Sequence, residues 1–111
     1  MNVAADATAS AIRRHRTRTE KRLNRLLDQA GSSATVDDIK GIIFNEEEDR
    51  PFIIYVMQLT ELFGDNADDD AVIPAIQDAW NYFPHRRFGG SCPAEQMLRL
   101  VPGLTPRDLR A

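Results

Sequence analysis

The sequence has one cysteine, one tryptophan and two histidines among its 111 residues. A single cysteine, Cys92, excludes an internal disulfide and is typical of a reducing compartment, so we expect a cytoplasmic protein. The longest apolar run, Phe52 to Met57, is far shorter than the roughly 20 residues that cross a bilayer. We therefore expect no membrane partner.

The scarcity of histidine and cysteine also limits catalytic and metal chemistry. A structural zinc site normally uses four nitrogen or sulfur ligands in close pairs, whereas this chain offers only His15, His85 and Cys92, widely spaced. The acidic runs at 46–49 and 65–70 lack the alternating ligands, central glycine and distal glutamate of a calcium loop. Cys92 with His85 as its base is a conceivable nucleophilic pair, but no third group marks a site. We expect no metal, no cofactor and no enzymatic activity.

The composition that is present is that of a globular protein. Hydrophobic residues make up 42% and charged residues 28%, which suffices for a single core and argues against a disordered chain. The length fits one domain. We expect a disordered N-terminus at 1–9, where no apolar periodicity is present, one helical domain at 10–103 and a short tail at 104–111.

Apolar residues recur at three- and four-residue steps, which predicts an all-α fold: a small bundle of four or five helices. The first helix is expected from Ser10 to Ala30. A second is expected from Val36 to about Glu48, although Gly41 and its β-branched neighbours leave a short strand as the competing assignment. The run from Phe52 to Phe63 is apolar on nearly every side and predicts a buried central helix.

The C-terminal third predicts a helix-loop-helix corner. A helix capped by Asp70 is expected to end near Phe83, because Pro84 cannot continue the helical ladder. Gly89 and Gly90 permit positive φ in the loop, and Pro93 then suits the first position of a last helix, with Cys92 as its cap.

This corner resembles the Xre/MbcA/ParS-type antitoxin toxin-binding domain, in which a Trp, a Pro, a Leu-Gly-Gly and a helix-starting Pro follow in that order. The residues that carry the resemblance are Trp80, Pro84, Phe88, Gly89, Gly90, Pro93 and Leu98. The resemblance covers this segment alone and implies a binding module. Similar runs also close the catalytic cores of some transposon integrases, but this chain lacks the strands and spaced carboxylates of such a core.

Charge is segregated along the chain. Residues 1–30 carry seven basic and three acidic side chains, residues 31–70 carry two and eleven, and the remainder carries five and three. The net charge is −3. The basic first helix could follow a phosphate backbone, or it could meet acidic residues of this chain or of a second copy.

We expect a non-catalytic protein-protein interaction module, with a protein partner that includes a second copy among its candidates. The net charge is negative, and no aromatic residues stand between the arginines. Both features favour a protein over a nucleic acid as the partner. The alternative function is a nucleic-acid-associated accessory protein. The predicted contact residues are Arg13, Arg14, Arg16, Arg18, Lys21, Arg22 and Arg25 on the first helix, and His85, Arg86 and Arg87 on an exposed edge of the corner.

Overall fold

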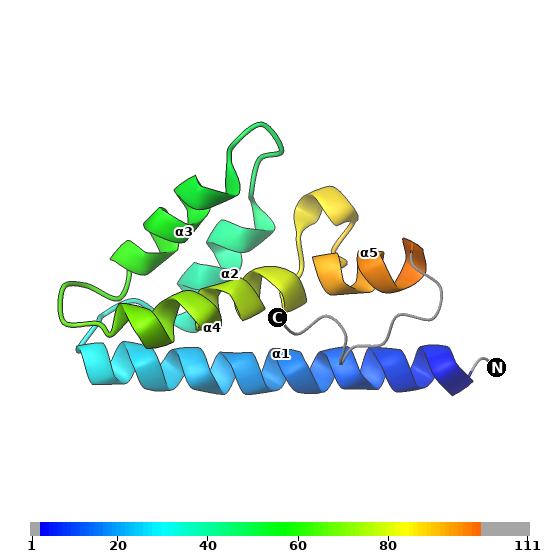
Figure 1. Cartoon of the computed structure of the whole chain (residues 1–111), viewed down its shortest axis with the longest axis horizontal. Helices are drawn as coiled ribbons and strands as arrows, with labels where there is room; N and C mark the ends of the chain where they lie inside the picture. Colours follow the sequence, from blue (N-terminus) through cyan, green and yellow to red (C-terminus); the bar gives the residue numbers. More distant parts are fainter. Residues whose placement is uncertain (1–2, 101–111) are drawn as a thin grey trace.

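The structure is a computed structural model that describes the backbone fold of residues 3–100 and the side chains of residues 9–99. Within this range the chain forms five α-helices, one short 3₁₀ helix and no strand, which confirms the predicted all-α bundle. The elements are α1 (Val3–Ala30), α2 (Val36–Phe44), α3 (Phe52–Glu61), α4 (Asp69–Tyr82), η1 (Arg86–Phe88) and α5 (Pro93–Leu100). Figure 1 shows α4 packed along the long α1, with α3 on the side of α4 away from α1.

The first helix begins earlier than expected. It starts at Val3 rather than near Ser10, so its helical backbone extends into the segment 1–9 for which we expected disorder. The reason is local composition, because Ala4, Ala5, Ala7 and Ala9 are the strongest helix formers and need no apolar stripe to favour the helix. The predicted tail, 104–111, lies outside the described residues.

The second helix is a helix and not a strand, but it is short. Thr35 and Asp38 form a reciprocal capping box at its start, as their spacing predicts. It ends at Phe44 rather than at Glu48. Asn45 closes the last turn, since its side-chain amide donates to the Gly41 carbonyl and its backbone N–H reaches the carbonyls of Gly41 and Ile43.

The third helix lies where expected but is not the buried centre of the fold. Only Tyr55, Val56 and Leu59 of α3 are buried. The other large apolar side chains are exposed, with fractions of 42% for Phe52, 59% for Ile53, 44% for Ile54 and 57% for Met57. The prediction of a buried helix is wrong because α3 packs on α4 and α2 with one face, and no element among residues 3–100 covers the other.

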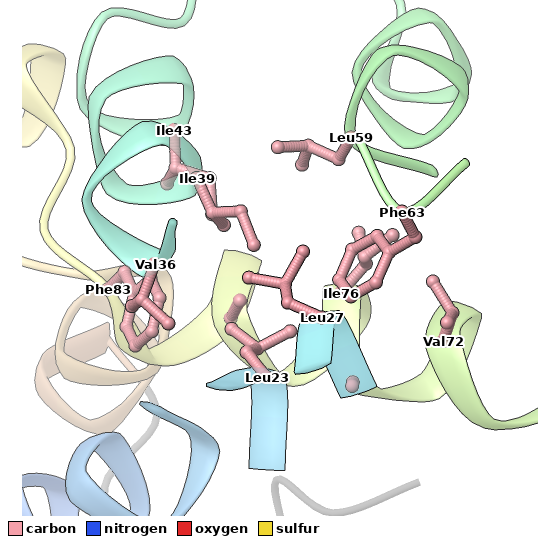
Figure 2. Packing of buried hydrophobic residues seen from close by; sticks show 12 residues of the cluster. Leu23, Leu27, Val36, Ile39, Ile43, Leu59, Phe63, Val72, Ile76 and Phe83 are labelled. Carbon is pink, nitrogen blue, oxygen red and sulfur yellow. The ribbon is translucent and has the colours of Figure 1, made fainter. Parts of the chain in front are cut away.

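The core lies where α1, α2, α3 and α4 meet. Figure 2 shows Leu23 and Leu27 of α1 pointing into a space closed by side chains from the other three helices. The other labelled members are Val36, Ile39, Ile43, Leu59, Phe63, Val72, Ile76 and Phe83. A smaller second cluster joins α1 to α4 and α5 through Ile12, Tyr82, Cys92 and Ala94.

The helix-loop-helix corner forms as predicted. Phe83, before Pro84, is extended with ψ 150°, so α4 ends at Tyr82. Gly89 and Gly90 have φ of 66° and 92°, positive values that residues other than glycine rarely adopt. At the other end of α4 the cap is Asp68 rather than Asp70, with the Asp68 side chain accepting from the backbone N–H of Asp70.

Leu23 gives a direct test of this core. Because its side chain is fully buried between helices, we expect Leu23→Ala to lower the free energy of unfolding by about 2–5 kcal/mol through lost burial and a residual cavity. The exposed neighbour Asn24, changed to Ala, should shift it by less than about 0.5 kcal/mol. Urea denaturation of both variants checks the difference, and equal effects would contradict the placement of α1.

Candidate interaction surfaces

Four of the predicted contact residues form one line on the solvent side of α1. Arg14, Arg18, Lys21 and Arg25 are spaced by four, three and four residues, so they share a helix face, and all four are exposed. This line, hereafter the basic stripe, lies opposite the face that carries Leu23 into the core. Arg13 is also exposed and flanks the stripe.

The other two arginines of α1 are used inside the fold. The Arg16 Nε donates to the Tyr82 carbonyl over 2.7 Å, and its Nη2 lies 3.4 Å from Glu95 Oε1. Arg22 reaches Asp78 of α4 over 3.4 Å. Both are partly buried and hold α1 to α4 and α5. The prediction that they contact a partner therefore gains no support from their placement.

Two hollows lie along this side of α1. The first, of about 410 Å³, is lined by Ser10, Arg13, Arg14, Thr17, Arg18 and Lys21. The second, of about 260 Å³, lies between α1 and α4 and is lined by His15, Arg18, Thr19, Lys21, Arg22, Arg25, Asp78 and Tyr82. Hydroxyls and cations around an open hollow are the groups that bind phosphate oxygens.

His85 does not lie on an exposed edge, so that prediction is wrong. Its side chain is 0% exposed, with Nε2 2.7 Å from the Trp80 carbonyl oxygen and Nδ1 3.2 Å from Glu46 Oε1. Because a carbonyl only accepts, Nε2 donates to Trp80, and Nδ1 faces the carboxyl of Glu46. His85 therefore joins α4 to the loop after α2 and is not available to an external partner.

Arg86 and Arg87 extend the same contact. They are exposed, but the Arg87 Nε donates to Glu46 Oε1 and the Arg86 Nη2 donates to Asn45 Oδ1. The Arg87 guanidinium also lies over the Phe88 ring, 4.4 Å from its centroid. These arginines thus attach η1 to the end of α2. The sequence did not predict the burial of Glu46, because this residue stands in a run of acidic residues that is typical of a solvent-exposed loop.

Cys92 and His85 do not form a pair. Cys92 is buried beside Ile12, Tyr82 and Ala94, whereas both ring nitrogens of His85 are engaged elsewhere. The backbone N–H of Cys92 donates to Glu95 Oε1 over 3.2 Å, which fits its predicted place at the cap of α5. Burial raises the pKa of the Cys92 thiol above its ordinary value of 9.0, and the carboxylate of Glu95 adds to the rise.

The outer face of α3 is the surface that the sequence did not reveal. The side chains of Ile53, Ile54 and Met57 project from this face. Met57 lies four residues after Ile53 and three after Ile54, so the three residues share one side of the helix. We call these three residues the apolar ridge. A signal was present in the sequence, because carboxylates stand on both sides of the run and point to exposure at its ends.

A groove of about 440 Å³ runs beside the ridge, between α2 and α3. Its lining includes the carboxylates of Asp37, Asp38 and Glu47 together with Arg50 and Gln58. Gln58 lies one helical turn after Ile54, so the groove borders the apolar ridge. The surface therefore combines an exposed apolar line with a mainly acidic trough.

Metal and membrane chemistry find no support among the described residues. No group of three or more histidine, cysteine or acidic side chains there is placed to hold a metal ion. No helix in the same range has the length and apolar character needed to cross a membrane.

Comparison with protein-family models, curated proteins and solved structures finds no match to this chain. The resemblance of the corner to the antitoxin domain therefore stays a prediction. A proposal for the function of this protein therefore depends on its own surfaces.

Glu46 tests the buried polar contact. We expect Glu46→Ala to destabilise the fold by about 1–3 kcal/mol, because it leaves Nδ1 of the buried His85 without its partner. Glu48→Ala is the matched control, since Glu48 is exposed and takes part in no ion pair within residues 9–99. Equal urea midpoints for the two variants would show that the contact with His85 is unimportant.

Cys92 provides a test of burial in the second cluster. Because burial raises its pKa, the thiol stays protonated at pH 8 and should react far more slowly with an aromatic disulfide reagent in the native protein than in denaturant. The stability that this neutral thiol contributes is complete below pH 9.0 and is lost as the pH rises through the higher folded-state pKa. Rapid reaction of the native protein at pH 8 would contradict the placement.

Proposed function

We propose that this protein is a non-catalytic protein-interaction module that binds through the apolar ridge of α3. The observation that carries the proposal is the exposure of Ile53, Ile54 and Met57 on one helix face. Contiguous apolar side chains with a polar rim are typical of protein contact sites. Full burial of such a side chain contributes about 1.5–3 kcal/mol. Because Ile53, Ile54 and Met57 are already about half buried, a partner that covers the ridge gains about half of that for each.

The charges around the ridge specify the chemistry of the partner. Between residues 45 and 70 the chain has nine carboxylates and one cation, Arg50. Glu47 and Asp38 line the groove next to the ridge. A partner that covers α3 must therefore bring apolar side chains flanked by lysine or arginine. A basic amphipathic helix fits, because its apolar stripe can lie along the ridge while its cations reach the groove.

A second copy of the chain fits this surface less well. Pairing of α3 with α3 would bring the same acidic rim together from both sides, which is unfavourable at low salt. The basic stripe of a second copy has the right charge, but it has no large apolar side chain to cover Ile53 or Met57. We therefore favour a different protein as the partner.

The proposed absence of catalysis is supported by the same geometry. Both nitrogens of His85 are held by Trp80 and Glu46, and the thiol of Cys92 is buried with a raised pKa. Neither group can therefore act on an external substrate without rearrangement of the fold. A buried free thiol also fits our proposal of a cytoplasmic location.

Binding of two designed helical peptides tests the proposal. Both are roughly five turns long with the same leucine stripe, and their flanks carry either lysine or glutamate. We expect the lysine peptide to bind, and Ile53→Ser/Met57→Ser to weaken its binding at least about tenfold, as loss of two buried apolar side chains requires. Met97→Ser on α5 removes an exposed apolar side chain elsewhere and should leave binding unchanged. Fluorescence anisotropy measures all three proteins.

Each alternative result has a defined meaning. If neither peptide binds, the proposed surface is wrong. It is also wrong if the Ile53→Ser/Met57→Ser variant binds the lysine peptide as tightly as the unchanged protein does. Light scattering over a concentration series adds a second readout. Dimerisation that the same double variant abolishes would keep α3 as a protein contact but would identify the partner as a second copy, against our choice of a basic helix.

A further inference from the structure

The basic stripe of α1 carries charge that no ion pair within the described residues neutralises, and the carboxylate in the adjoining hollow, Asp78, is paired with Arg22. Arg14, Arg18, Lys21 and Arg25 form no ion pair there, although Arg16, Arg22 and Glu20 of the same helix are paired with Glu95, Asp78 and Lys40. Like charges three or four residues apart destabilise a helix. The stripe contains three such pairs in succession. An external anion bound there would therefore stabilise the helix.

The spacing of the stripe fits an extended polyanion rather than a single ion. From Arg14 to Arg25 the helix advances by about 16 Å at roughly 1.5 Å per residue. A nucleic-acid duplex presents one phosphate charge per about 1.7 Å of its axis, so several phosphates face this length of helix. The hollow of about 410 Å³ adds the hydroxyls of Ser10 and Thr17 between the cations.

The composition of the exposed face distinguishes among polyanions. The helix α1 has no Phe, Tyr or Trp, and Tyr82, which lines the second hollow, is buried and stacked on His15. Single strands therefore find no exposed Phe, Tyr or Trp ring there on which to stack their bases. Among residues 9–30 the exposed face also has no large apolar side chain free to insert into a membrane interface, since Ile12, Leu23 and Leu27 are buried and Leu26 packs against the core. A regular duplex, which needs only cations and hydroxyls along its backbone, is the partner that this face suits.

The acidic residues at 46–49 do not prevent this contact. The acidic loop between α2 and α3 lies on the far side of α4 from α1 (Figure 1). A helix with its side chains is about 10–12 Å across, which exceeds the Debye length of about 8 Å at physiological salt. The repulsion that this loop exerts on a polyanion bound at α1 is therefore largely screened.

We infer that the basic stripe of α1 binds the phosphate backbone of a nucleic-acid duplex without reading its sequence. The contact is electrostatic and is made by Arg14, Arg18, Lys21 and Arg25, with Arg13 at the side. This inference does not depend on the apolar ridge, which lies on another helix. If both surfaces act, the chain connects a duplex to a protein.

Salt-dependent binding to a mixed-sequence DNA duplex tests the inference. With four phosphate contacts, the logarithm of the affinity should fall against the logarithm of salt with a slope of about −3 to −4. Arg14→Gln/Arg18→Gln should reduce the magnitude of that slope by about 2. Arg50→Gln/Arg99→Gln removes the same charge from exposed positions off the stripe and should leave the slope unchanged. Circular dichroism checks that all variants remain helical.

Several results would overturn the inference. No binding at a salt concentration of about 50 mM, where such contacts are strong, would exclude the duplex as a ligand. An equal loss in the two double variants would show that only overall charge matters. Equal binding of polyglutamate would instead favour an acidic protein. Binding to phosphatidylserine vesicles, with none to the duplex, would favour a membrane surface.

Discussion

The packing of α1 against α4 determines which surfaces of this protein face outward. Leu23 and Leu27 insert between the other helices, while Arg16 and Arg22 connect the same helix to α4 and α5 through a carbonyl and two carboxylates. With its apolar face and two of its arginines committed inward, α1 presents the basic stripe to solvent. The other side of α4 is then available to α3, which covers it with one face.

That arrangement explains why α3 is exposed although its sequence is so apolar. The core is already filled by α1, α2 and α4, and α3 contributes only Leu59 and nearby buried side chains to it. The remaining apolar side chains, Ile53, Ile54 and Met57, are exposed, with no element from the described part of the chain over them. Such a surface is costly for an isolated protein, and we attribute it to a partner whose basic flanks match the acidic groove beside α3.

Local rules predicted much of the fold, and tertiary contacts decided the rest. Proline, glycine and capping residues placed the corner and the start of α2, because their effects act over a few residues. The outward direction of Ile53 and the burial of His85 and Glu46 depend on which helices pack together, and periodicity alone does not contain that information. An apolar sequence on every side of a helix predicts burial, and only the packing of the neighbouring helices shows which side is exposed.

The central claim is that the apolar ridge faces solvent when the protein is alone. A soluble paramagnetic agent added to a dilute, methyl-labelled sample measures this directly through the relaxation of individual methyl groups. We predict strong enhancement at Ile53, Ile54 and Met57 and little at Ile39, Ile43 and Leu59, which are buried. Equal protection of Ile53 and Ile39 would mean that α3 is buried after all, and the protein-interaction surface proposed here would not exist.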